Sequence, residues 1–163
     1  GDMATAAKAA ARLAAIAEPD SETTPTATAL ALSVRARMAA AAGDSAKALE
    51  MLEQVQWAHV GRVAAAEPMD RLLRADLLAA AGRNADALRW YATIGNGSPQ
   101  ELPLVGFAAL GMARVNERLG DRAAALREYR RVASLWGQAD APLQALAIAA
   151  GKRVTALDSV VQR

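Results

Sequence analysis

The chain has 163 residues, of which 53% are apolar and only 4% aromatic, with 19 basic and 17 acidic side chains. This length suffices for one domain with a buried core, and the abundance of alanine favours helices over strands. The net charge of +2 excludes a strongly basic surface, charges interrupt every apolar run before it could span a membrane, and the absence of cysteine excludes disulfides and thiol chemistry.

In chain order, the sequence predicts a first helix over 3–17, three helix hairpins over about 26–58, 68–95 and 103–136, and a last helix over 141–160. Together these are about eight helices in a single domain, 1–163. Each hairpin is expected to turn at a glycine, because glycine adopts the left-handed conformation that ends many helices. The turn glycines are Gly43, Gly82 and Gly120, and the last is followed by Asp121, a residue suited to capping the next helix.

Small residues recur with a regular period. In one set, each alanine begins a copy of the same pattern of spaced apolar residues. These alanines are Ala9, Ala48, Ala87 and Ala125, at intervals of 39, 39 and 38 residues. A second set stands seven positions before each turn glycine, at Ala36, Ala75 and Ala113. A period of this length predicts helix pairs that stack on their neighbours.

One further period leads from Ala113 to Gly151 in the last helix. The register predicts that Gly151 packs closely against the helix that begins near Ala125. The alternative is that Gly151 is an ordinary weak point in a terminal helix.

These alanines and turn glycines, with Tyr91 and Tyr129, resemble the tetratricopeptide repeat family of the bacterial type over nearly the whole chain. The chain departs from the family because its first helices lack the early aromatic residue and its repeats lack the closing proline. The resemblance implies an all-α fold, a right-handed α-solenoid of stacked antiparallel hairpins. It also implies a non-enzymatic scaffold for protein–protein interaction. A weaker likeness, in Arg89–Tyr91 and Trp136–Leu143, is to repeat regions of larger bacterial regulatory proteins.

In that family, the first helix of each hairpin lines a concave groove that binds peptides or partner helices. The register set by the turn glycines predicts that the exposed groove positions include Ser33, Arg37, Leu72, Asp76, Leu110, Arg114, Glu117 and Arg118. Three arginines along one groove suit a carboxylate-bearing peptide. The alternative is that they are solvated helix charges that pair with Asp76 and Glu117.

No catalytic residue, metal site or cofactor is expected. His59 is a lone histidine without the partners of a nucleophile–base arrangement. The segment Gly95-Asn96-Gly97 lacks the following Lys-Ser/Thr of a phosphate loop and is expected to be a turn. The compartment is left open, with the cytoplasm favoured.

Two other functions are left open: self-association through the first or last helix, and weak binding of nucleic acid or another acidic surface. The second would use an arginine cluster in the second helices, Arg89, Arg127, Arg130 and Arg131. Nucleic-acid binding is disfavoured by Glu128 within that cluster and by the low net charge. The tryptophans in or just after these helices are expected to fill the seams between hairpins, at Trp57, Trp90 and Trp136.

Overall fold

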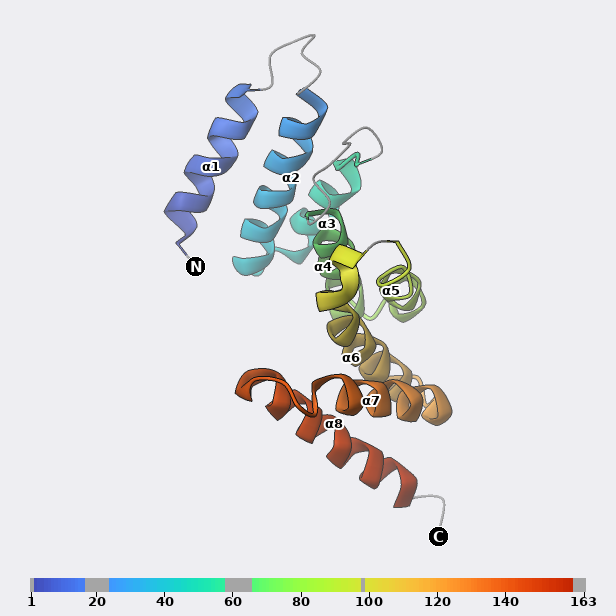
Figure 1. Cartoon of the computed structure of the whole chain (residues 1–163). Coiled ribbons are helices and arrows are strands. Elements are labelled where there is room, and N and C mark those ends of the chain that lie inside the picture. The colour runs from blue at the N-terminus through green and yellow to red at the C-terminus, as the bar shows by residue number, and fades with distance from the viewer. Residues whose placement is uncertain (1, 17–23, 58–65, 98, 160–163) are drawn as a thin grey trace. The chain divides into compact units, whose positions relative to one another are not determined.

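The structure is a computed structural model that describes residues 2–16, 24–57, 66–97 and 99–159 (Figure 1). These ranges contain eight α-helices and one short 3-10 helix: α1 (Met3–Ile16), α2 (Thr24–Ala41), α3 (Ser45–Gln54), α4 (Ala66–Ala80), α5 (Asn84–Tyr91), η1 (Pro99–Glu101), α6 (Leu102–Arg118), α7 (Arg122–Trp136) and α8 (Ala141–Ser159). The described ranges contain no strand, so the all-α prediction is confirmed. The expected helix ends at residues 17, 58 and 160 lie outside the described residues.

Three helices end in the same hydrogen-bonded turn. At the end of α6, the Gly120 N–H donates to the carbonyl three residues back at 3.1 Å, and the Asp121 N–H donates to the carbonyl five residues back at 2.9 Å. Gly120 has a φ of +77°, which side-chain-bearing residues rarely adopt. The same two bonds end α2 at Gly43 and α4 at Gly82, with φ angles of +85° and +74°. The prediction of a left-handed glycine at each turn is confirmed.

The helices that follow the turns differ in their caps. Asp121 Oδ1 accepts a 3.0 Å hydrogen bond from the Ala124 N–H, and Asp44 Oδ1 accepts one of 3.0 Å from the Lys47 N–H. Each carboxylate thereby satisfies a backbone donor that the first turn of a helix leaves unpaired. Arg83 stands at the same position before α5 and makes no side-chain cap. The predicted cap at Asp121 is confirmed.

Six of the seven alanines in the two periodic sets are buried completely, whereas the seventh, Ala9 of α1, is exposed and its neighbour Ala10 is buried instead. All six have a side-chain exposure of 0%: Ala36, Ala48, Ala75, Ala87, Ala113 and Ala125. Any larger side chain at these positions would have to displace its neighbours, because interiors are close-packed. These six alanines are therefore core residues, and the prediction of a buried alanine at position 9 is wrong, because α1 turns Ala10 inward.

The chain divides into two compact units, residues 1–77 and 78–163, with the boundary near the end of α4. In the first unit, α2 packs against both α1 and α3. The core beside α3 contains Ala36, Ala48, Leu52 and Leu77.

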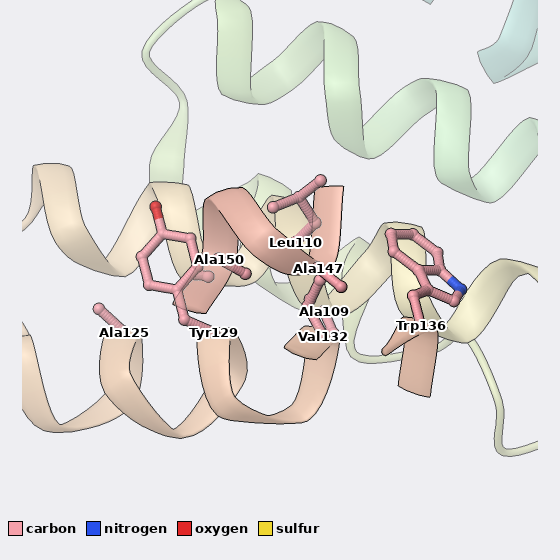
Figure 2. Packing of buried hydrophobic residues seen from close by; sticks show 9 residues of the cluster. Ala109, Leu110, Ala125, Tyr129, Val132, Trp136, Ala147 and Ala150 are labelled. Carbon is pink, nitrogen blue, oxygen red and sulfur yellow. The ribbon is translucent and has the colours of Figure 1, made fainter. Parts of the chain in front are cut away.

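In the second unit, α6 packs against α5 and α7, and α7 packs against α8. One face of α7 carries Tyr129, Val132 and Trp136 toward α6 and α8, with the two aromatic rings near opposite ends of that face (Figure 2). Ala109 and Leu110 of α6 and Ala147 and Ala150 of α8 complete the cluster.

Two glycines of α6 lie against aromatic rings. A methyl group added at Gly106 would overlap the indole ring of Trp136, and one added at Gly111 would overlap the phenol ring of Tyr91. Trp136 is only 7% exposed and also meets Phe107, with ring centroids 4.8 Å apart and planes at 63°. Trp136 thus fills the space between α6 and α7, and the glycines give the rings room.

Gly151 does not make the close contact that the register predicts. A methyl group added there would meet no atom within 4 Å, and Gly151 is only half-buried. Its neighbour Ala150, 1% exposed, and Ala147, 5% exposed, are the residues of α8 in the core. The prediction of close packing at Gly151 is wrong, because the face of α8 that packs on α7 carries Ala147 and Ala150 instead.

Candidate functional site

A charged site of the second unit lies on the last turns of α6. Arg114 and Arg118, one helical turn apart, are both exposed, and with Glu117 they line a depression of about 460 Å³. Residues spaced by three and four positions share a helix face, which explains why these three side chains meet.

Glu117 is held by side chains from two other helices. The Tyr129 hydroxyl of α7 donates a 2.6 Å hydrogen bond to Glu117 Oε2, and Arg153 of α8 forms an ion pair with the same carboxylate. Arg153 therefore neutralises the negative charge of Glu117. The two arginines of the depression give it a net positive charge.

Burial and the two arginines act in opposite directions on the pKa of Tyr129. Burial raises the pKa of the Tyr129 phenol above its ordinary value of 10.0, while the positive charges of Arg114 and Arg118 act to lower it. Desolvation disfavours the phenolate, and nearby cations favour it. Both guanidinium groups thus act electrostatically on the hydroxyl that anchors Glu117.

The two arginines differ in what they already bind. Arg118 donates one hydrogen bond to the Ala79 carbonyl and one to Asn84 Oδ1, each of 3.1 Å. In the described part of the chain, Arg114 has neither a hydrogen bond nor an ion pair. Arg114 is therefore the group with free donors for a ligand, and Arg118 is partly pre-positioned beside it.

The predicted groove residues of the first unit form a different arrangement. Asp70 of α4 is 5% exposed, and its Oδ1 accepts hydrogen bonds from the Ser33 hydroxyl at 2.7 Å and from the Arg37 guanidinium at 2.6 Å. Ser33 is itself 4% exposed. The expectation of an exposed Ser33 is wrong because its hydroxyl points to a buried carboxylate. Arg37 pairs with Asp70, so its reversal to glutamate would set two carboxylates together and would disturb folding.

Burial raises the pKa of Asp70 above its ordinary value of 3.8, although Ser33, Arg37 and the Trp57 indole N–H act to lower it. Arg74, on the same helix, has its pKa lowered by burial, against the opposing effects of Glu53 and Asp70. Desolvation is therefore the dominant cause at both groups. The role of Asp70 as the partner of Ser33 and Arg37 was not predicted from the sequence. The repeat register aligns Ser33 with Leu72 and leaves Asp70 outside the groove positions.

The remaining predicted groove residues lie in mixed surroundings. Asp76 is exposed and Leu72 is half-buried. Leu110 is 8% exposed and belongs to the core around Tyr129 and Trp136, so its expected exposure is wrong. The reason is that α7 and α8 cover this face of α6.

The arginine cluster of the second helices is paired with acids. Arg89 pairs with Asp86, Arg130 with Asp158, and both Arg127 and Arg131 with Glu128. Four cations that share three carboxylates leave a weak positive potential, which gives little support to phosphate binding.

The loop that follows α5 binds a carboxylate of its own chain. The backbone N–H groups of Gly95 and Gly97 donate to Glu101 Oε2 at 2.6 Å and 3.3 Å. Glu101 is 2% exposed, and Gly95 has a φ of +93°. The segment is a turn, as expected, and its donors are taken up by Glu101.

No group of three or more His, Asp or Glu side chains that could hold a metal ion is found among the described residues. His59 lies outside them. Of the helices in the described ranges, none combines the length and the hydropathy needed to cross a bilayer.

Comparison of the chain with protein-family models, with curated proteins and with solved structures finds no match. The class that the structure defines over the described residues is an all-helical protein.

Proposed function

We propose that this chain is a non-enzymatic scaffold for protein–protein interaction, whose helix hairpins stack as a right-handed α-solenoid. Two features support the repeat: the shared hydrogen-bonded turn at three glycines and the six alanines without exposed surface. Repeats of this kind bury a common core by stacking on their neighbours and offer an extended surface to a partner.

The binding site of this proposal is the depression at Arg114 and Arg118, and its ligand is a carboxylate of a peptide or protein. The observation that carries it is that Arg114 is exposed and has no ion pair in the described ranges, beside a Glu117 that Arg153 already neutralises. A guanidinium presents a planar fork of donors that matches a carboxylate. A partner would therefore gain a charge-assisted contact without displacing one of the chain's own.

A capture experiment from the source cell tests this function, with the wild-type chain, Arg114→Glu and Lys152→Glu as baits. Lys152 is exposed in the same unit and lies outside the depression, so its reversal changes the net charge equally. We expect a partner retained by the wild type and Lys152→Glu and lost by Arg114→Glu. A partner retained equally by all three baits would contradict the site.

Self-association is a second candidate. Ile16 of α1 and Ile148 of α8 are each 56% exposed, which leaves apolar side chains on the first and last helices. Light scattering over a range of concentrations tests it, and a monomer mass independent of concentration would exclude it.

A further inference from the structure

The first unit contains a second cleft, formed by α1, α2 and α3. Its lining includes Met3, Met38 and Met51, three of the five methionines of the chain. Its volume is about 410 Å³, within the range of roughly 300–1,000 Å³ that ligand-binding clefts occupy. We refer to it as the methionine cleft.

The methionine cleft uses a face of α2 separate from the buried cluster at Asp70. The α2 residues that line it are Arg35, Met38 and Ala39, whose spacing places them on one side of the helix, and Ala42 lines it from the turn that follows. Ser33 and Arg37, which bond to Asp70, are not among its lining residues. The cleft is therefore independent of the Arg114 site and of the interactions that hold α4.

The lining of the cleft carries two cations and one carboxylate, and so a net positive charge. Arg35 and Lys47 are exposed, and within the described residues no carboxylate pairs with either side chain. The third charged residue of the lining, Asp44, is engaged as the cap of α3. An occupant would thus meet apolar methionine side chains and two cations that no carboxylate of the described residues pairs with.

We propose that the methionine cleft binds an apolar segment of another protein that carries acidic residues on either side of its apolar anchor. Methionine side chains are flexible and polarisable, so a cleft lined by methionines can adapt to varied apolar side chains. The two cations favour acidic flanks by charge complementarity. Nucleic acid is a poor occupant, because two cations neutralise few phosphates and most of the lining is apolar.

The test uses the whole chain with ¹³C-labelled methionine methyl groups and two synthetic peptides. Both peptides are amphipathic helices with leucine at positions i, i+3, i+4 and i+7; one has glutamate and the other lysine at the remaining positions. Met69 and Met112 lie outside the cleft and report nonspecific binding. We expect the glutamate peptide to shift the Met38 and Met51 signals saturably, without shifting Met69 or Met112, and at least tenfold more tightly than the lysine peptide.

The charge assignment has its own variant. Arg35→Glu combined with Lys47→Glu should reverse the preference between the two peptides. Lys8→Glu combined with Arg12→Glu, at exposed positions of α1 outside the lining, changes the net charge equally and should leave the preference unchanged. Thermal unfolding of both variants checks that they fold.

Three results would overturn the proposal: no saturable shift of Met38 and Met51, equal affinity for the two peptides, or an unchanged preference in the Arg35 and Lys47 variant. A failure here leaves the Arg114 site untouched, because the two surfaces share no residue.

Discussion

The Tyr129 hydroxyl donates a 2.6 Å hydrogen bond to Glu117 Oε2, and this bond joins α7 to the face of α6 that carries Arg114. Tyr129 itself is only 3% exposed. The Tyr129 hydroxyl thus links the core of the second unit to its charged surface. The pKa of this hydroxyl should therefore respond to changes in the charges of that surface.

Replacing Arg114 with alanine should raise the pKa of Tyr129 further. Arg114 acts to lower this pKa, because a nearby cation favours the phenolate, while burial raises it above 10.0. Absorbance titration at alkaline pH measures the change, and Tyr129→Phe identifies its signal against Tyr91, the only other tyrosine. An unchanged Tyr129 titration in Arg114→Ala would place Arg114 away from the depression.

Methyl groups added at two helical glycines should have opposite effects. Gly106→Ala should destabilise the fold by about 1–3 kcal/mol, because the new methyl would overlap the Trp136 ring. Gly151→Ala meets no atom within 4 Å and should stabilise α8 by about 0.5–1 kcal/mol, because alanine favours helices. Chemical denaturation of both variants checks the pair. Equal effects would contradict the packing of α6 against α7.

The missing cap of α5 should be repairable. Asp121→Ala should cost about 1 kcal/mol, because the Ala124 N–H loses its acceptor. Arg83→Asn should add a few tenths to 1 kcal/mol, since asparagine caps well and the exposed ion pair of Arg83 with Asp86 contributes little. Thermal unfolding measures both, and a less stable Arg83→Asn would argue against a common turn geometry.

The buried carboxyl of Asp70 should make stability fall as the pH rises. Because burial raises its pKa above 3.8, the folded chain keeps this proton at pH values where the unfolded chain has released it. The free energy of unfolding therefore loses this contribution as the pH increases from about 3.8 through the raised pKa.

Asp70→Asn is the variant for this test, since the amide keeps the shape of the carboxyl without its titration. As the pH rises from about 4 to about 7, we expect the wild type to lose stability relative to Asp70→Asn. Urea unfolding at several pH values measures it, and a difference independent of pH would refute the role of burial.

The sequence predicted the features that depend on local spacing. Gly120 and Asp121 were identifiable as a turn and a cap because both act within one turn of their own backbone. The alanine register located buried contacts such as Ala113, because a small residue at a constant period is a packing signal.

The features that the sequence did not predict depend on partners far along the chain. The register places Ser33 at a groove position, but its hydroxyl donates a hydrogen bond to Asp70, which stands 37 residues later in the chain. Gly106 has no turn and no positive φ to mark it, and only the Trp136 ring of the next helix accounts for it. In the candidate site, Arg114 and Glu117 were expected, whereas the ion pair from Arg153 on α8 was not.

The most direct test of the central claim is a calorimetric titration of the captured partner, or of its carboxylate-bearing peptide, into the wild-type chain and into Arg114→Glu. Loss of a charge-assisted contact of about 1.5–3 kcal/mol predicts a dissociation constant raised by roughly ten- to a hundredfold, with thermal stability unchanged. Lys152→Glu should bind as the wild type does. An affinity that Arg114→Glu leaves unaltered would contradict the account.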